Sequence, residues 1–338
     1  MKILLNLFLH LCQAFIFVRN QKGSFQITTA FVEGFKETMY MVSQQKTPRL
    51  FGRSRTETQN SESDSYERIG TGDEEANDIL DRHGDTPINN TSHTRRHVST
   101  QDADWGDLID RLDRVRLIIR PDDAYVRIGI MTLNRKKDDV FIAAALGLAR
   151  EGKNGTSTVA LPDSRKIVAV AEDGSGASRF NVFTLTLMNA KFDEEDIEDG
   201  VTKYFAWSSK VKQHLLNETK ATSSDFTTVQ ALTSGKINEF MGFQFIRSER
   251  LPVTTAATNY DPDDGQVGAV VDVLAAGARR CFAWVEDGML SVTAVDLFAD
   301  VGPRRDKRMS TQIYVQHSVG AVRMEEEKVL EVLVDETL

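Results

Sequence analysis

The sequence predicts an α+β protein in which a long helix separates a polar projection from a β-rich half. Apolar side chains keep a helical spacing through residues 122–149, which predicts a single helix roughly 40 Å long. Residues 49–100 are polar with isolated apolar side chains, and after Gly155 short apolar runs alternate with turn residues. A long polar projection beside a long helix favours a protein that assembles with its neighbours.

The composition is that of a globular protein, and it argues against several functions. The chain has 338 residues, of which 41% are apolar and 27% are charged. Its net charge of −9 disfavours a protein that grips nucleic acid tightly, because such proteins usually carry a basic face. Two cysteines, Cys12 and Cys281, are too few for a disulfide framework or a cysteine-rich zinc site.

The chain begins with an apolar run whose role has three interpretations. Residues 3–18 read ILLNLFLHLCQAFIFV, which is short for a membrane span and lacks a clear signal-peptide cleavage site. The third interpretation is that translation starts near Ile27, so that this run is not part of the working protein. Residues 27–45 then form a short amphipathic helix, because apolar side chains from Phe31 to Val42 share one helical face.

Residues 49–100 are the least core-like part of the chain. Alternation over residues 65–69 allows a strand, and the glycines at 70 and 72 are typical of a turn. A polar stretch of this length is either disordered or an extended hairpin whose partners lie in other subunits.

Residues 103–119 are amphipathic and contain four aspartates spaced three residues apart. Such carboxylates could hold a cation or form a catalytic pair, but interleaved arginines favour a solvated helix face with local ion pairs. The residues concerned are Asp104, Asp107, Asp110, Asp113, Arg111, Arg114 and Arg116.

The second half of the chain is predicted to contain short elements. We expect short apolar runs at 166–171 and 183–187, an acidic surface loop at 191–200, strands at 204–207, 240–246, 313–322 and 328–334, a helix at 209–216, and a hairpin of 281–285 with 289–295 around Asp287-Gly288.

No motif in the sequence indicates catalysis. His93 and His97 have the spacing of a helical metal pair, but their context predicts a strand or loop without the acidic residue that such a motif needs. Gly174-Ser-Gly is typical of a turn, because the Gly-Lys-Ser/Thr of a phosphate loop does not follow it. The sequence therefore predicts no enzyme, no cofactor, and no catalytic, cofactor-binding or metal-binding residue.

A short basic cluster follows Pro303. It could contact phosphate, but the overall acidity of the chain favours acidic loops of a neighbouring subunit. Its members are Arg304, Arg305, Lys307 and Arg308.

Several phrases occur in the order that is typical of one protein family. Before and within the long helix stand Asp85-Thr-Pro, Ser92-His-Thr-Arg-Arg, DADWGDLID from Asp102, Leu112-Asp113 and NRKKDDVFIAAALG from Asn134. Later come Ser224-Asp-Phe, Gly235-Lys-Ile, FMGFQFIRSERLP from Phe240, Asp306-Lys-Arg, Gln312-Ile-Tyr-Val and GAVRMEEEKVLE from Gly320. No single phrase is specific, but their ordered run over roughly residues 27–336 resembles the major capsid proteins of tailed bacteriophages.

The resemblance implies a Hong Kong 97-type capsid fold with an N-terminal arm, an extended β-hairpin loop, a spine helix, and peripheral and axial domains. In this chain it implies an arm at 27–48, an extended loop at 49–100, a peripheral domain at 101–152 and 281–338, and an axial domain at 153–280. Residues 1–26 have no counterpart in the family pattern.

The implied function is that of a self-assembling icosahedral shell, made in the host cytoplasm, which encloses double-stranded DNA without reading its sequence. The implied partners are further copies of the chain as hexamers and pentamers, a separate scaffolding protein and a portal protein, with no membrane in the mature shell. Alternatives are an encapsulin-like protein compartment, and a membrane-anchored or secreted enzyme that uses residues 3–18. The expected inter-subunit contacts are Arg53, Arg55, Tyr66, Arg68, Arg95, Arg96, Arg304, Arg305, Lys307 and Arg308.

Overall fold

The computed structural model describes residues 44–61, 63–70, 78, 88–110, 122–169, 179–195, 197–198, 200–217, 239–254, 258–259, 273–274 and 277–336. The apolar run at 3–18, most of the helix predicted over 27–45 and the turn predicted at Gly174 lie outside these residues. No helix within the described ranges is both long and apolar enough to cross a membrane.

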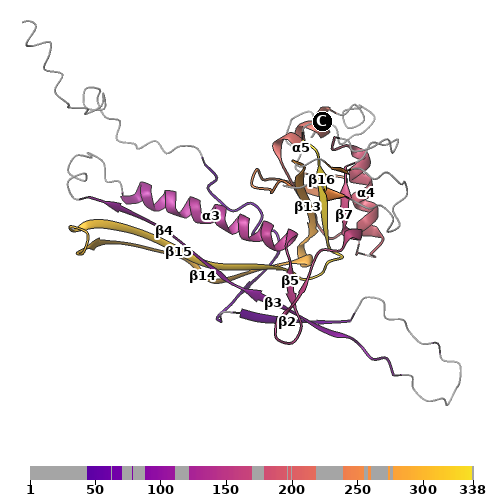
Figure 1. Cartoon of the computed structure of the whole chain (residues 1–338), viewed down its shortest axis with the longest axis horizontal. Helices are drawn as coiled ribbons and strands as arrows, with labels where there is room; N and C mark the ends of the chain where they lie inside the picture. The colour runs from indigo at the N-terminus through magenta and orange to yellow at the C-terminus, as the bar shows by residue number, and fades with distance from the viewer. Residues whose placement is uncertain are drawn as a thin grey trace, which may run out of the picture.

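A long helix lies along one face of a four-stranded sheet, and the two together form an elongated unit that we call the spine (Figure 1). The helix, α3, spans Asp122–Leu146, which confirms the predicted long helix. The sheet has the order β1-β14-β15-β4. Its strands are β1 (Arg55–Thr58), β14 (Met289–Arg304), β15 (Ser310–Arg323) and β4 (Gln101–Ile109), and all neighbours are antiparallel except β1 and β14.

Apolar side chains hold α3 against this sheet. Leu133 of the helix is buried with Ile313 and Val315 of β15. Gly129 allows a close approach, because a Cβ there would lie 2.6 Å from Trp105 Cε3 on β4. Burial of this helix face is the main reason that so long a helix is stable.

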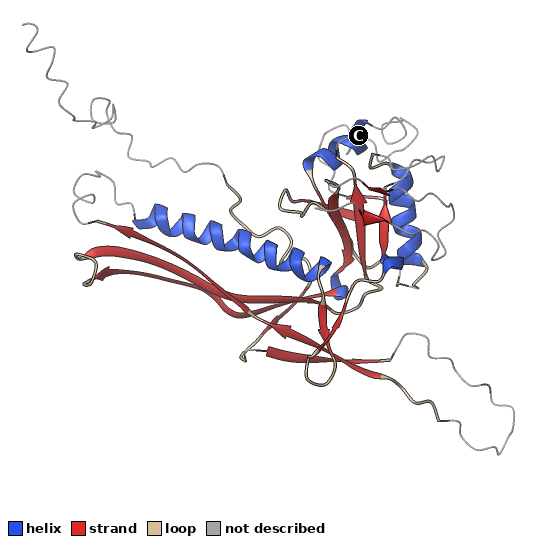
Figure 2. Cartoon of the chain, in the orientation of Figure 1, coloured by secondary structure: helices blue, strands red, loops and turns tan. Residues whose placement is uncertain are grey.

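The second unit, which we call the body, is built on a six-stranded sheet of order β7-β16-β13-β8-β10-β9 (Figure 2). Its strands are β7 (Lys166–Val168), β16 (Val329–Val334), β13 (Arg279–Val285), β8 (Lys203–Trp207), β10 (Phe243–Arg247) and β9 (Glu239–Phe240), and its helices are α4 (Val182–Asp193) and α5 (Ser209–Asn217).

An aromatic cluster fills the core of the body and connects it to the spine. The ring of Trp284 on β13 stacks on Tyr204 of β8, with centroids 5.5 Å apart. Phe141 of α3 meets the same Trp284 edge-on at 5.4 Å. Such pairs add to the burial energy of the rings, so the end of α3 is packed into the body.

A third, smaller sheet projects away from the spine with the order β2-β3-β5-β6. Strands β2 (Ser63–Ile69) and β3 (His93–Ser99) form an antiparallel hairpin that confirms the strand predicted at 65–69. Strands β5 (Ala149–Glu151) and β6 (Ser157–Val159) follow α3 and brace the base of this hairpin. Two short strands, β11 (Thr258–Asn259) and β12 (Val273–Leu274), pair with each other.

Two of the sequence predictions are wrong because distant strands, and not local periodicity, decide the structure. The helix predicted around the aspartates is wrong at Asp104 and Asp107, which lie in a strand, β4, that pairs with β15 from Gln101↔Val319 to Ile109↔Thr311. Asp110 follows this strand, whereas Asp113, Arg111, Arg114 and Arg116 lie outside the described residues. The predicted hairpin around Asp287-Gly288 is a connection between two sheets, because β13 pairs with β16 and β8 whereas β14 pairs with β15 and β1.

Two further predictions need smaller corrections. The apolar run at 183–187 lies inside helix α4, whose first turn is capped by the Asn181 side chain accepting from the Thr184 amide. The strand predicted at 240–246 is split into β9 and β10 by a turn at Met241 and Gly242, both with positive φ. The strands predicted at 204–207, 313–322 and 328–334 and the helix at 209–216 are confirmed.

A buried arginine joins the three units. Arg323, at the end of β15, donates hydrogen bonds to the carbonyl oxygens of Ala145 (2.8 Å) and Gly147 (3.0 Å) at the end of α3. It also donates to the Val159 carbonyl of β6 at 3.1 Å and pairs with Glu326 at 3.3 Å. The guanidinium thus satisfies carbonyls that the helix end leaves without an intrahelical donor.

A buried histidine lies between α3 and the sheet. His317 of β15 is 2% exposed, and neither ring nitrogen has a hydrogen-bond partner among the described residues. Burial, and then the nearby Lys137 of α3, lower its pKa to about 4, against the opposing effects of Asp296 on β14 and Asp102 on β4. The spine therefore accommodates this histidine in its neutral form.

Replacing Arg323 with methionine should lower the free energy of unfolding by about 3 kcal/mol. The substitution keeps the side-chain volume similar, but it leaves the carbonyls at the end of α3 without this donor and removes one of the arginine partners of Glu326. Urea unfolding of the purified subunit measures this loss. Arg305→Met, at an exposed site, is the control and should leave the midpoint unchanged; equal effects of the two substitutions would contradict the role of Arg323.

Acid should destabilise the spine through His317. Its folded-state pKa lies below its usual value of about 6.5, so the stability is complete above pH 6.5 and is lost as the pH falls towards 4. The loss should be roughly 3 kcal/mol relative to a His317→Gln variant, which does not titrate. Unfolding free energies of both proteins between pH 7 and pH 4 test this, with His93→Gln as the exposed control. Parallel pH curves for wild type and His317→Gln would rule it out.

Candidate assembly surfaces

The β2–β3 hairpin has one anchored face and one exposed face. Its register runs from Ser63↔Ser99 to Ile69↔His93, and the side chains of β2 alternate between exposed and partly covered positions. Tyr66 packs against a cluster that includes Val98 of β3 and Leu290 of β14. Burial and the neighbouring Glu57 raise the pKa of Tyr66 to about 12, so its hydroxyl stays protonated.

Two arginines, one of them buried, join this hairpin to the rest of the subunit. Arg96 is 1% exposed, pairs with Glu326 and donates to the Met324 carbonyl at 3.4 Å. Arg68 on β2 lies 3.6 Å from the same Glu326 carboxylate. Because Glu326 also pairs with Arg323, the hairpin is joined to the residues that hold the end of α3. Both arginines were expected to contact other subunits, and the structure gives each of them a partner inside its own.

The exposed face of the hairpin is polar. Arg95 forms an ion pair with Glu67 across the two strands. His97 Nε2 donates to the Gly152 carbonyl at 2.6 Å, and its Nδ1 lies 3.1 Å from the Ser65 hydroxyl. Both ring nitrogens of His97 are therefore engaged. Among the described residues, no three histidine, cysteine or acidic side chains lie close enough together to hold a metal ion.

A surface hollow of about 660 Å³ lies beside this face. Its lining includes Glu67 and Glu151 together with Arg95 and Lys153. Acidic and basic side chains are mixed in this lining, so the hollow favours neither an anionic nor a cationic ligand.

The chain enters the spine at a buried carboxylate. Asp138 of α3 accepts hydrogen bonds from the backbone amides of Arg49 and Leu50, both at 3.0 Å, and from Gln45 Nε2 at 2.5 Å. One turn earlier in α3, the Asn134 side chain donates to the Lys46 carbonyl at 2.8 Å. These bonds fix the point where the preceding segment leaves the spine. Asp138 was not predicted as a functional residue, although its spacing from Phe141 and Ile142 places it on the apolar face of α3.

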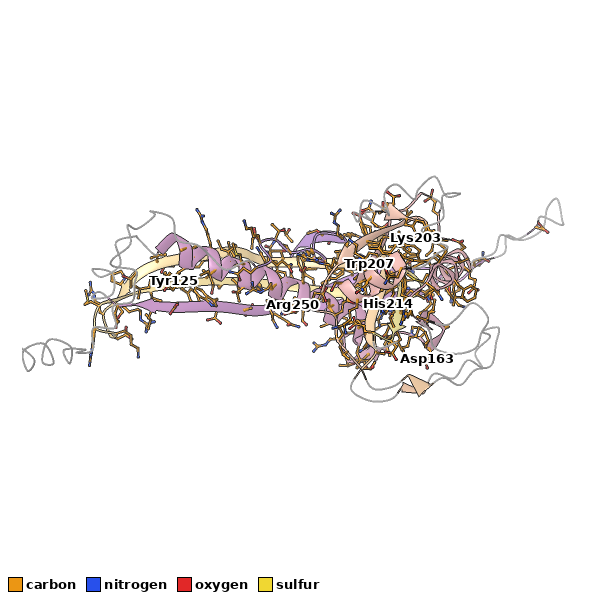
Figure 3. All side chains as sticks on the ribbon, turned by 90° about the horizontal axis from the view of Figure 1, so that it is seen from above. Tyr125, Asp163, Lys203, Trp207, His214 and Arg250 are labelled. Atoms are coloured by element: carbon orange, nitrogen blue, oxygen red, sulfur yellow. The ribbon has the colours of Figure 1, made fainter. Side chains whose placement is uncertain are left out.

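The adjoining acid, Asp139, faces the other way and pairs with Arg250, which lies beside α3 near the body (Figure 3). The Arg53 guanidinium lies 5.8 Å from the centroid of the Tyr204 ring, and Arg55 pairs with Glu57. Arg53 thus contacts its own body, whereas Arg55 is exposed on β1.

The far end of the β14–β15 hairpin, which we call the tip, carries the basic cluster. Arg304 donates two hydrogen bonds to Asp306, at 2.8 and 2.7 Å, and these lower the pKa of that carboxyl to about 2. Arg305, Lys307 and Arg308 are exposed and have no ion-pair partner among the described residues. The ten expected contact residues are therefore divided between the tip, the hairpin and the start of the spine, and their contacts with other subunits stay a prediction.

Removing the Asp138 carboxylate should loosen the segment before residue 51. Asp138→Ala leaves the Arg49 and Leu50 amides without an acceptor, at a cost of about 2 kcal/mol. Limited trypsin digestion should then cut after Lys46 and Arg49 several times faster than in the wild type. The matched control is Asp139→Ala, which removes the neighbouring carboxylate that pairs with Arg250 and not with the incoming segment. Unchanged cleavage rates in Asp138→Ala would show that this carboxylate does not hold the segment.

Comparisons with known proteins agree with this architecture. A family model described as phage capsid protein matches residues 27–336. No curated protein sequence matches the chain.

Solved capsid structures resemble most of the chain. The capsid of cyanophage P-SCSP1u superposes with a TM-score of 0.65 at 14% identity, covering 90% of this chain and 93% of that one. The capsid of Ralstonia phage GP4 gives a TM-score of 0.64 at 10% identity, covering 94% and 97%. The acid-stable capsid of Helicobacter pylori bacteriophage KHP30 gives 0.62 at 10% identity, covering 94% and 99%.

These likenesses show the Hong Kong 97-type capsid fold. The family model spans most of the chain, as the ordered phrases of the sequence indicated. The chain therefore belongs to the phage capsid protein family, and it is a major capsid protein that forms the shell of the virion.

Proposed function

We propose that this capsid protein assembles as hexamers and pentamers into the icosahedral shell of a tailed phage, and that the shell encloses double-stranded DNA. The observation that carries the proposal is the β2–β3 hairpin, which is held firmly at its base and projects away from its own subunit. A projection of this kind is useful to a protein that clasps a neighbour, and it gives nothing to a monomer.

The far part of the hairpin is suited to contact another subunit. Ile69 is 69% exposed and Ile88 is 92% exposed. Covering two such side chains on a neighbour would contribute a few kcal/mol. Contacts of modest size are sufficient in a closed shell, because every subunit makes several of them at once.

The proposed division into domains follows the sheets of the structure. The arm at 27–48, the extended loop at 49–100 and the axial domain at 153–280 remain our assignment, with two changes. Leu50 and Phe51 are buried in the main core, and β1 belongs to the spine, so the loop proper begins after residue 58. The six-stranded sheet combines β7, β8 and β10 with β13 and β16, so we group those last two strands with the axial domain and not the peripheral one.

The net charge of −9 supports a wall that encloses DNA without binding its sequence. We also propose a separate scaffolding protein, a portal protein, assembly in the host cytoplasm and no membrane in the mature shell. An encapsulin-like compartment is distinguished by its contents, which would be protein instead of DNA.

Shortening the hairpin should stop assembly without unfolding the subunit. Gly70 N–H bonds to the Ser92 carbonyl at 2.8 Å, so residues 71–91 can be replaced by Asn-Gly while β2, β3 and their buried side chains are kept. A larger deletion that begins at Ser54 would also remove β1.

Electron microscopy and sedimentation of the purified protein, with its candidate scaffold, test the shortened variant. It should unfold at the wild-type temperature but form no closed particles. A second variant, in which a Gly-Ser linker of equal length replaces residues 71–91, keeps the length of the segment but not its sequence. It shows whether assembly depends on the length of the hairpin or on its side chains. Normal particles from the Asn-Gly variant would contradict the clasping role.

A further inference from the structure

One part of the spine sheet has no described element on either its outer surface or its strand edge. On the face opposite α3, the inner part is covered by β3, whose Val98 packs on Leu290 and Val292 of β14. At Gly320 the crossing is so close that a Cβ would lie 2.8 Å from the Ser99 carbonyl oxygen. Beyond that crossing, the same face extends to the tip without a covering element (Figure 1). We call this region the open face.

The strand register places acidic and apolar side chains together on the open face. Each row across β4, β15 and β14 contains residues that point the same way. The rows are Asp102, Ser318 and Val295; Asp104, Gln316 and Phe298; Gly106, Tyr314 and Asp300; and Leu108, Gln312 and Gly302.

The apolar side chains on this face are uncovered. Phe298 is 50% exposed, Leu108 is 45% exposed and Val295 is 45% exposed. Asp102, Asp104 and Asp300 have no ion-pair partner among the described residues, so the open face is both apolar and negatively charged. A patch of this kind indicates a partner that is apolar and positively charged.

The tip of the same chain has the complementary chemistry. Arg305, Lys307 and Arg308 are unpaired cations there, and the adjoining Met309 is 49% exposed. The turn that presents them is strained, because Arg308 and Met309 adopt φ values of 51° and 60° in the left-handed region.

Polar contacts maintain this strained turn. The Ser310 hydroxyl donates to Asp110 Oδ1 at 2.6 Å, and the Ser310 amide donates to the Lys307 carbonyl at 2.9 Å. The turn between β14 and β15 lies at the end of the spine that is remote from the body (Figure 1), and it is held there in a fixed conformation. A half-exposed apolar side chain on a turn of fixed conformation is available to a second molecule.

We propose that the tip of one subunit docks on the open face of a second copy, with Met309 beside Phe298 and the tip cations on Asp102, Asp104 and Asp300. The tip of a subunit cannot fold back onto its own open face, because β14 and β15 are paired without interruption from Phe298↔Gln316 up to Arg304↔Ser310. The proposal rests on the shell function, and it names a surface on which the subunits of that shell meet.

The contact is heterologous, since each copy offers its tip to one neighbour and its open face to another. Heterologous contacts close into rings or extend into sheets, and both are consistent with a shell. The contact is too small to hold two isolated subunits together, so it acts only when many copies are joined. DNA is the other partner that a basic tip could take, but DNA would leave the acidic and apolar open face unexplained.

Charge reversal in both directions tests the pairing. Arg305→Glu, Lys307→Glu and Arg308→Glu together, or Asp102→Lys, Asp104→Lys and Asp300→Lys together, should each lower the particle yield at least tenfold. The chain that carries all six substitutions should regain most of the yield, because the charges again match. Asp193→Lys with Glu194→Lys, on the exposed side of α4, is the control and should assemble as the wild type does. Thermal unfolding of every variant confirms that the subunit is folded.

A cross-link provides a second measurement. A Met309→Cys subunit and a Phe298→Cys subunit, mixed and assembled, should form a disulfide-linked dimer that neither forms alone. The proposal is overturned if the two triple reversals assemble as the wild type does. It is also overturned if the particle yield of the chain with all six substitutions is no higher than that of either triple variant and the cross-link is absent. Loss of DNA content with normal empty particles in the tip reversal alone would also overturn it and assign the tip to DNA. Absence of particles from the wild type itself would count against the shell function, and not specifically against the docking.

Discussion

The arrangement of the molecule depends on one buried guanidinium. The charge of Arg323 is tolerated in the interior because carbonyl groups from α3 and β6 and the Glu326 carboxylate surround it. Burial lowers the pKa of this arginine, but its ordinary pKa is so high that it stays charged. Since Glu326 also holds Arg96, the same charge network ends the helix, positions the hairpin and connects both to the body. A single cation thereby sets the directions in which the three units point.

Two other buried polar groups lie along the spine. Asp138 accepts hydrogen bonds from the backbone amides of an incoming segment, and His317 stays neutral between helix and sheet. Each is a polar group that the sequence places on an apolar surface, where an unpaired charge would be costly. The spine has only a small core, so buried polar side chains help to specify how its helix, sheet and neighbouring segments are arranged.

Sequence reasoning was accurate where structure is local. The periodicity of α3, the short helix α5 and the run of β8 depend on neighbouring residues, and these elements were predicted. It failed at β4, where aspartates at every third position suggest a helix, while Ala103, Trp105 and Ile109 alternate inward as in a strand. The choice between the two periods is made by β15, which lies far along the chain. Pairing with distant strands also explains why β13 and β14 could not be assigned to separate sheets. Arg96 was expected at the surface because its partner, Glu326, lies far along the chain and the sequence does not reveal their pairing. The open face could not be found from sequence, since it exists only when three distant strands are in register.

The direct passage from β13 into β14 makes the spine a mechanical lever. The short turn Glu286–Gly288 joins the central sheet of the body to a strand of 16 residues, with no flexible linker between them. At ~3.3 Å per residue this strand is about 50 Å long. If the body rotated by about 10° as a rigid unit with the spine, the tip would therefore be displaced by roughly 9 Å. Small rotations of the body would thus become large displacements of the tip, so a shell built from such levers can change its curvature while each subunit keeps its internal packing.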